Sequence, residues 1–116
     1  ENTYVDIKAG RFNIARTALD KVLAITPNDP KLHYYYGMLY RLSEKTRAGE
    51  EKALRGFKKS IELDSSLPVV YREMGLLYSK RGEKRKARQA FLQYLKLAPT
   101  AKDRNQIKEY LAELGG

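Results

Sequence analysis

Residues 68–101 read PVVYREMGLLYSKRGEKRKARQAFLQYLKLAPTA. The informative positions in this stretch are mostly aromatic or small, and they are Tyr71, Met74, Gly75, Tyr78, Gly82, Ala87, Phe91 and Pro99. Earlier in the chain the same spacing recurs at His33, Tyr36, Gly37, Tyr40, Ala53 and Phe57. Self-similarity at a fixed spacing is typical of structural units stacked side by side, so it predicts a repeat fold.

The repeat length follows from pairs of equivalent residues. Phe57 and Phe91 are 34 residues apart, whereas Tyr40 and Tyr78 are 38 apart. Four additional residues therefore lie within residues 43–52, and we expect either a longer loop or one more turn on the first helix there, or a contact loop. Apolar residues recur at helical spacing almost throughout the chain, and strand alternation is not sustained, so each unit should be a pair of helices.

This pattern resembles the tetratricopeptide repeat (TPR), a helix–turn–helix unit of 34 residues. Residues 68–101 match nearly every element of it, residues 30–67 have Ser65 at the closing proline, and residues 1–29 keep only the second half. The resemblance implies an all-α fold: a single domain over residues 1–116 that forms a short right-handed superhelical α-solenoid. Because the first repeat is partial and the chain begins at Glu1, we expect a longer parent chain.

The end of the chain is predicted to cap the repeats. Apolar residues recur there at i, i+3, i+4 and i+7, namely Ile107, Tyr110, Leu111 and Leu114. A helix with one apolar and one polar face is needed where a repeat array ends, so residues 102–114 should form a capping helix. Together with the repeats, this gives predicted helices at 1–9, 12–25, 31–46, 51–63, 68–81, 84–97 and 102–114.

The resemblance also places a binding surface on the first helix of each unit. One stripe of that helix packs into the array, and the adjacent stripe lines the inner, concave face where partners of such repeats bind. The residues predicted to contact a partner are Lys31, Tyr34, Tyr35, Met38, Arg41, Arg72, Glu73, Leu76 and Lys80. Tyr and Arg are enriched in binding hot spots, and a guanidinium grips a carboxylate with two hydrogen bonds.

These residues point to a protein or peptide segment with acidic and apolar side chains. Tyr35 and Met38 have an alternative interpretation as packing residues between repeats, and a small-molecule pocket is a further alternative. Relatives of this repeat that hold a C-terminal carboxylate use Lys, Asn and Arg on these positions, but no Asn occurs on the inner stripes here.

The positive charge is unevenly placed along the chain. Residues 1–29 carry four cations and four anions, so the net charge of +9 comes from the later repeats, with the densest run at residues 80–88. Such a run is typical of a solvated turn, and it also attracts acidic protein, anionic lipid or nucleic acid. Exposed aromatics that would stack on bases, Tyr34 and Tyr35, lie on a different helix, so we do not expect a nucleic-acid partner.

The residues that catalysis requires are missing. There is one histidine, His33, which occupies an aromatic position of the repeat, and there are no cysteines. No set of His, Cys or carboxylate residues has zinc-ligand spacing, and no phosphate loop or activated nucleophile is present. We therefore predict no catalytic residue, no metal and no cofactor. No apolar run is long enough to span a membrane.

We predict a non-catalytic scaffold for protein–protein interaction. One alternative is a docking or regulatory arm of a larger enzyme, because a diffuse set of residues is similar to the TPR arrays of some bacterial zinc metallopeptidases: His33, Tyr34, Tyr35, Tyr94, Leu97, Pro99, Asp103 and Tyr110. Another is a self-assembling module that forms homo-oligomers through the partial first repeat. Nucleic-acid binding is the weakest alternative. The sequence suits a soluble protein of the cytoplasm or bacterial periplasm and does not fix the compartment.

Overall fold

The computed structural model describes residues 2–115, with Asn2 described by its backbone alone, and this range forms seven α-helices and no strand. The helices are α1 Asn2–Lys8, α2 Phe12–Ile25, α3 Pro30–Ser43, α4 Arg47–Leu63, α5 Pro68–Lys80, α6 Lys84–Leu97 and α7 Arg104–Glu113. The predicted all-α class is confirmed for the described residues. The predicted start of the first helix at residue 1 lies outside them.

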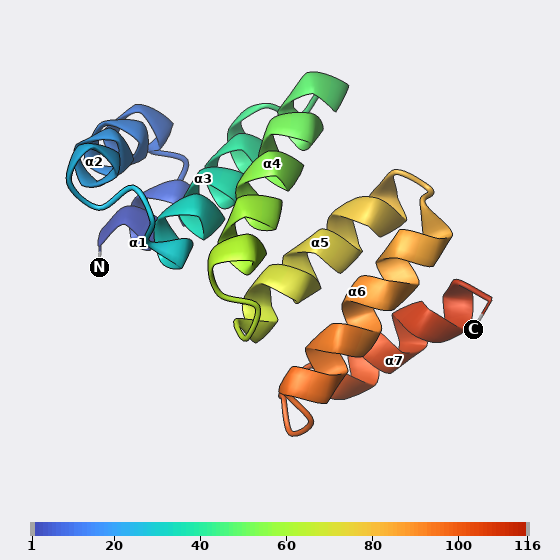
Figure 1. Cartoon of the computed structure of the whole chain (residues 1–116). Coiled ribbons are helices and arrows are strands. Elements are labelled where there is room, and N and C mark those ends of the chain that lie inside the picture. Colours follow the sequence, from blue (N-terminus) through green and yellow to red (C-terminus); the bar gives the residue numbers. More distant parts are fainter. Residues whose placement is uncertain (1, 116) are drawn as a thin grey trace. The chain divides into compact units, whose positions relative to one another are not determined.

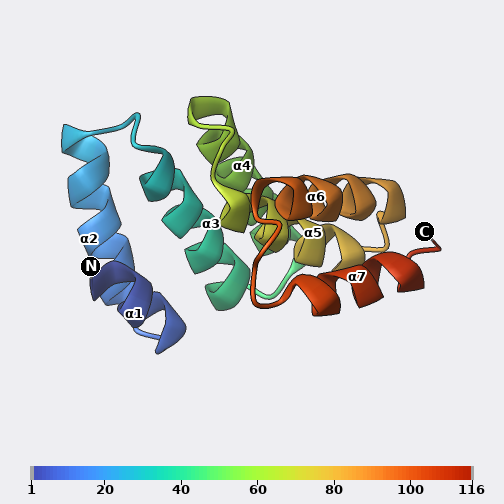
Figure 2. The ribbon, with the colours of Figure 1, turned by 90° about the horizontal axis from the view of Figure 1, so that it is seen from below.

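The chain divides into two compact units between Ser65 and Ser66. In unit 1, residues 2–65, α1 packs against α2 and α3, α2 against α3, and α3 against α4 (Figure 1). In unit 2, residues 66–115, α5 packs against α6 and α6 against α7 (Figure 2). The division lies two residues before the predicted repeat boundary at Leu67, and the arrangement of the repeats as one solenoid stays a prediction.

Each unit contains one helix hairpin with the same close crossing. A Cβ atom on Gly37 of α3 would lie 2.5 Å from ring atoms of Phe57 on α4, and a Cβ on Gly75 of α5 would lie 2.5 Å from ring atoms of Phe91 on α6. Both phenylalanines are fully buried. Glycine is needed at these two positions because any side chain would overlap the ring that fills the hairpin core.

The predicted small residues on the second helices also lie in the core. Ala53 of α4 and Ala87 of α6 are both completely buried. Gly10 and Gly82, in the turns between paired helices, adopt φ angles of 83° and 77°. This left-handed region favours glycine, so these two residues end one helix and allow the next to begin, as the sequence suggests.

The four additional residues of the 30–67 repeat mainly lengthen the second helix of the hairpin. α4 has 17 residues against 14 in α6, and α3 has 14 against 13 in α5. The expectation of a longer loop or of one more turn on the first helix is therefore wrong. Thr46 caps α4 by accepting a hydrogen bond of 3.1 Å from the Gly49 backbone N–H, and a Cβ on Gly49 would lie 1.9 Å from the Glu44 carbonyl oxygen.

The last helix covers part of α6, as the apolar spacing predicts. Ile107 is completely buried, and the Tyr110 ring lies 5.8 Å from the Phe91 ring between centroids. α7 begins at Arg104 rather than at residue 102. Asp103 stands at the N-cap position, but its side chain makes no cap hydrogen bond because Arg72 and Tyr94 hold its carboxylate.

Candidate functional site

The nine residues predicted to contact a partner fall into two groups, one in each unit. Five lie on α3 of unit 1, and they are Lys31, Tyr34, Tyr35, Met38 and Arg41. Four lie on α5 of unit 2, and they are Arg72, Glu73, Leu76 and Lys80. We describe the two groups separately.

Two residues of the α3 group are core residues. Tyr34 is 7% exposed and Met38 is 2% exposed. The Tyr34 ring lies 6.1 Å from the Phe57 ring of α4, so it belongs to the hairpin core. The expectation that Tyr34 is an exposed aromatic is wrong, because α3 is flanked by α1, α2 and α4 and little of its circumference remains open. The packing interpretation is the right one for Met38.

Lys31 and Tyr35 are brought together at the surface. They line a hollow of about 210 Å³ together with Leu19 and Val22 of α2, while Asp29 and Leu32 complete its wall. Lys31 is exposed, and its backbone N–H donates a hydrogen bond of 3.0 Å to the Asp29 carboxylate, which caps α3. The site therefore has an apolar floor, a half-buried phenol, one cation at its edge, and a carboxylate that already accepts a backbone hydrogen bond.

Tyr35 is positioned by two neighbouring tyrosines. Its ring lies 6.3 Å from the Tyr4 ring of α1 and 5.5 Å from the Tyr34 ring, both tilted. Tilted aromatic pairs at this separation are favourable because the positive edge of one ring meets the negative face of the other. The core thus holds Tyr35 in a fixed direction, which lowers the entropy that a partner would lose on binding to it. Arg41, also on α3, is half-buried.

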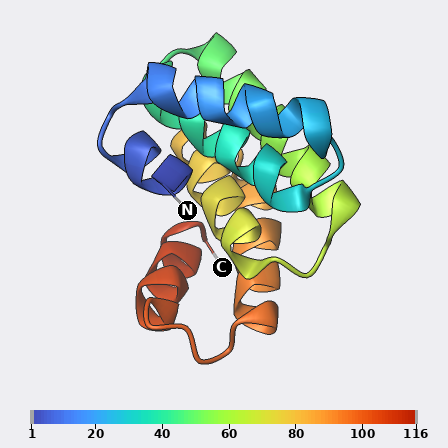
Figure 3. The ribbon, with the colours of Figure 1, turned by 90° about the vertical axis from the view of Figure 1, so that its left-hand side faces the viewer.

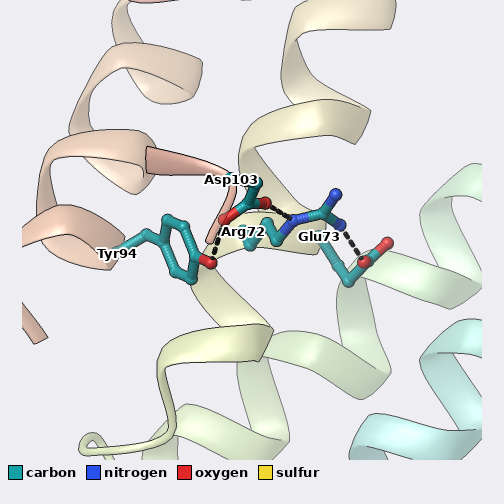
Figure 4. A network of polar contacts seen from close by, with 4 residues as sticks. All are labelled: Arg72, Glu73, Tyr94 and Asp103. Carbon is teal, nitrogen blue, oxygen red and sulfur yellow. Dashed lines mark hydrogen bonds and ion pairs between the residues drawn. The ribbon is translucent and has the colours of Figure 1, made fainter. Parts of the chain in front are cut away.

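The α5 group contains a polar network inside unit 2 (Figure 4). The Arg72 guanidinium donates from Nε to Asp103 at 2.5 Å and from Nη1 to Glu73 at 2.8 Å. The Tyr94 hydroxyl of α6 donates to the other Asp103 oxygen at 2.5 Å. Arg72 thus joins α5 to the segment that precedes α7, and Tyr94 joins the same segment to α6.

Protonation follows from these contacts. Burial raises the pKa of Tyr94 to about 12, and its hydrogen bond to Asp103 acts in the same direction. Burial alone would raise the pKa of the Asp103 carboxyl, but hydrogen bonds from Tyr94 and Arg72 outweigh it and lower that pKa. At neutral pH the network therefore contains an ionised Asp103, a protonated Tyr94 and a charged Arg72.

Arg72 holds carboxylates, as its predicted role requires, but both belong to its own chain. Glu73, predicted as a contact residue, is 5% exposed and pairs with Arg72. Sequence reasoning did not find this network, because Asp103 lies 31 residues from Arg72 and a helical pattern does not report such contacts. Leu76 is half-buried and Lys80 is exposed, so these two remain on the surface of α5.

A second hollow lies on the other side of α3. It measures about 380 Å³ and is lined by Leu23, His33, Tyr36, Tyr40, Lys52, Arg55 and Gly56. The Tyr36 hydroxyl donates to Asp20 at 2.5 Å, and Arg16 and Lys52 lie 5.3 and 5.4 Å from the centre of the Tyr40 ring. These contacts join α2, α3 and α4. Tyr36 and Tyr40 of α3 therefore pack between helices, as predicted for the stripe that enters the array.

The basic run at residues 80–88 is mainly solvated. Lys80, Lys84, Arg85 and Lys86 are exposed. The Arg81 side chain is buried and lies 2.8 Å from the Glu83 carboxylate, which also pairs with Lys86 at 3.4 Å. A partly buried ion pair thus spans the turn between α5 and α6, and the remaining cations form a positive surface around it.

Neither a protein-family model nor a curated protein matches this chain. Across residues 2–115, no three His, Cys, Asp or Glu side chains gather closely enough to hold a metal ion. Within the same range, no helix has both the length and the apolar character needed to cross a membrane. The functional proposal therefore depends on the geometry of the surfaces described above.

Proposed function

We propose that this chain is a non-catalytic protein-interaction module of the tetratricopeptide type, with its hairpins stacked as a solenoid. The repeated Gly–Phe crossings of α3 with α4 and of α5 with α6 support this assignment, because two hairpins of one design come from two copies of one sequence pattern. Repeat arrays of this kind present extended surfaces for partners. In this proposal the first helix of each hairpin carries the contact residues.

The observation that carries the proposal is the hollow beside Lys31 and Tyr35. Its floor of Leu19 and Val22 accepts an apolar side chain, and the exposed Lys31 attracts a carboxylate next to it. A rigid aromatic beside an apolar recess is the usual composition of a binding hot spot. The occupant that fits best is a peptide segment in which an apolar residue is followed or preceded by an acidic one.

Charge favours the same class of partner. Residues 1–29 are balanced, and the later residues give the whole chain a net charge of +9. A positive surface raises the rate at which acidic segments associate, and this effect weakens as salt screens it. On unit 2, an external carboxylate would compete with Asp103 for the Arg72 guanidinium, so Leu76 and Lys80 are the better contact residues there.

The test uses peptides that combine acidic and apolar residues, with matched peptides in which Asp and Glu are replaced by Asn and Gln. Fluorescence anisotropy is measured at low and at physiological salt. We expect the acidic peptides to bind more tightly than their amide counterparts, and tightest at low salt. Lys31→Ala combined with Tyr35→Ala should weaken binding about tenfold, the effect of losing about 1.4 kcal/mol.

A matched control removes a cation and an exposed apolar residue elsewhere. Leu92 and Lys96 of α6 are both exposed, so Leu92→Ala combined with Lys96→Ala should leave peptide affinity unchanged. Equal loss in both double variants would show that the hollow is not the binding site. Absence of binding by every acidic peptide would overturn the proposed function as a whole.

A further inference from the structure

The outward side of α2 is unusually apolar for a surface. Ile14 is 57% exposed and Ile25 is 79% exposed. A broad hollow of about 640 Å³ on α2 is lined by Asn13, Ile14, Thr17, Ala18, Lys21 and Val22. In Figure 3, α2 lies in front of α3 with the short α1 beside it.

The apolar residues on this side form one continuous stripe. Ile14, Ala18, Val22 and Ile25 are spaced at i, i+4, i+8 and i+11, which places them along one face of a helix. The residues of α2 that enter the core, Ala15 and Leu19, lie next to this stripe around the helix. The apolar side of α2 is therefore wider than the part that unit 1 covers, and Ile14 and Ile25 lie on the uncovered part.

Exposed apolar residues concentrate in this part of the protein. Among residues 3–115 the large exposed hydrophobic residues are Tyr4, Val5, Ile14, Leu23, Ile25, Val69 and Leu92. The first five belong to α1 and α2, while Val69 and Leu92 are single residues on different helices. Scattered exposed apolar residues need no explanation, but a continuous group usually marks a contact with another molecule.

The charge distribution indicates which molecule fits this face. The chain carries +9, so two copies repel each other over most of their surface. Residues 1–29 add nothing to this charge, because their four cations and four anions balance, as do the three cations and three anions of residues 102–116. The α2 stripe thus lies in a segment whose own charges add no net repulsion between two copies.

The order of residues in the stripe also suits pairing with itself. Read in either direction from Ala18, a branched apolar residue follows after four positions, Ile14 on one side and Val22 on the other. In an antiparallel pair of α2 helices, Ala18 would face Ala18 and Ile14 would face Val22. A small residue at the centre lets the two helix axes come close, and a two-fold contact needs only one self-complementary surface.

We propose that this α2 stripe, formed by Ile14, Ala18, Val22 and Ile25, is a self-association surface whose occupant is the same stripe of a second copy. The contact is an antiparallel, two-fold helix pair centred on Ala18. It does not require the peptide-binding function, although Val22 borders both hollows.

Cysteine cross-linking tests the geometry directly, because the natural sequence has no cysteine. Ala18→Cys places two sulfurs at the centre of the pair, where mild oxidation should give a covalent dimer in high yield. The matched control is Ala112→Cys, which alters an exposed alanine of α7. We expect rapid dimer formation for the first variant and little for the second, and equal cross-linking rates would overturn the proposal.

Sedimentation over a wide concentration range tests the energetics without a cross-link. Ile14→Glu should leave a folded monomer, whereas Leu92→Glu, at another exposed apolar residue, should dimerise like the parent protein. Added salt should strengthen the dimer because it screens repulsion between two positive copies, whereas salt weakens binding of an acidic peptide. A monomer at all concentrations and salt levels overturns the proposal, and peptide binding would be unaffected by that result.

Discussion

The hairpin of α3 and α4 in unit 1 and the hairpin of α5 and α6 in unit 2 share a core contact and differ around it. In both, a glycine on the first helix lies against a phenylalanine ring on the second. In unit 1 a second glycine, Gly56, also lies at the crossing, where unit 2 has Ala90 one residue before its phenylalanine. The two hairpins therefore have one common ring-on-glycine contact but different limits on how large the neighbouring residue may be.

The hairpins also differ in the residues that the inner stripe of the first helix carries. α3 is flanked by three helices, and its inner stripe contributes Tyr34 and Met38 to the core. α5 packs mainly on α6, and the corresponding stripe carries Arg72, which pairs inside unit 2 with the carboxylates of both Glu73 and Asp103. One repeat pattern thus supports an apolar inner stripe in one unit and an ionic network in the other.

The largest expected effect on stability comes from replacing Gly56, the second glycine at the crossing of α3 and α4. A Cβ on Gly56 would lie 2.8 Å from the His33 carbonyl oxygen and 2.9 Å from the Gly37 nitrogen, and backbone atoms cannot move aside as a side chain can. We expect Gly56→Ala to lower the free energy of unfolding by about 3 kcal/mol, near the upper end for overpacking. Urea denaturation followed by circular dichroism measures this change.

The reciprocal exchange in unit 2 is the control. Ala90→Gly creates no overlap, and it should lower the free energy of unfolding by only about 1 kcal/mol through the poorer helix propensity of glycine. If Gly56→Ala costs no more than Ala90→Gly, a Cβ at residue 56 causes no overlap, and the proposed difference between the hairpins would then be wrong.

The next effect concerns the ionic network of unit 2. Arg72→Met removes the cation that pairs with both Glu73 and Asp103, and it releases Asp103, the residue before α7. Breaking a buried pair from one side costs about 3 to 5 kcal/mol, and we expect between about 2 and 3 kcal/mol here because Arg72 is partly exposed. Hydrogen exchange of α7 amides should accelerate more than exchange in α3.

Lys80→Met is the matched control, since Lys80 is an exposed cation on the same helix. It should leave exchange in α7 unchanged. If Lys80→Met and Arg72→Met accelerate α7 exchange equally, the loss reflects the general charge of α5 rather than the network.

The comparison also shows what a helical pattern can and cannot predict. Apolar periodicity gave the bounds of α2 and α6 as observed, because strong i, i+3 and i+4 spacing reports a buried helical face. It misplaced the start of α4 by four residues, because α4 begins at Arg47 and not at residue 51. Gly49 lies inside α4, where it lets the Glu44 carbonyl approach closely.

The candidate site was harder to predict than the fold. The exposure of Lys31 and Lys80 could be predicted from their charge, because lone cations are rarely buried. The burial of Tyr34 did not follow, because the sequence of α3 does not show that α1, α2 and α4 surround it. Arg72 and Asp103 meet across 31 residues, and such a contact depends on where α7 folds back rather than on any local pattern.

The smallest expected effect is a loss of stability at alkaline pH that arises in unit 2. The pKa of Tyr94 is raised to about 12 in the folded chain, against about 10 in an unfolded one. Its contribution is fully present below pH 10 and is lost as the pH rises from about 10 to about 12, because the phenolate cannot donate to the Asp103 carboxylate. A change of the pKa from about 10 to about 12 corresponds to at most about 2.7 kcal/mol of unfolding free energy, and screening by solvent around the network reduces it to about 2 kcal/mol.

Tyr94→Phe isolates that contribution. The variant should be less stable than the parent at neutral pH, and the difference should shrink steadily above pH 10 until the two denaturation midpoints converge. Tyr36→Phe in unit 1 provides the comparison, since Tyr36 donates in the same way to Asp20 and its pKa is raised further by burial and by that bond. Its difference from the parent should therefore persist to higher pH than the Tyr94 difference. A pH-independent difference for Tyr94→Phe would contradict the expected loss of the hydrogen bond to Asp103 when the Tyr94 hydroxyl ionises.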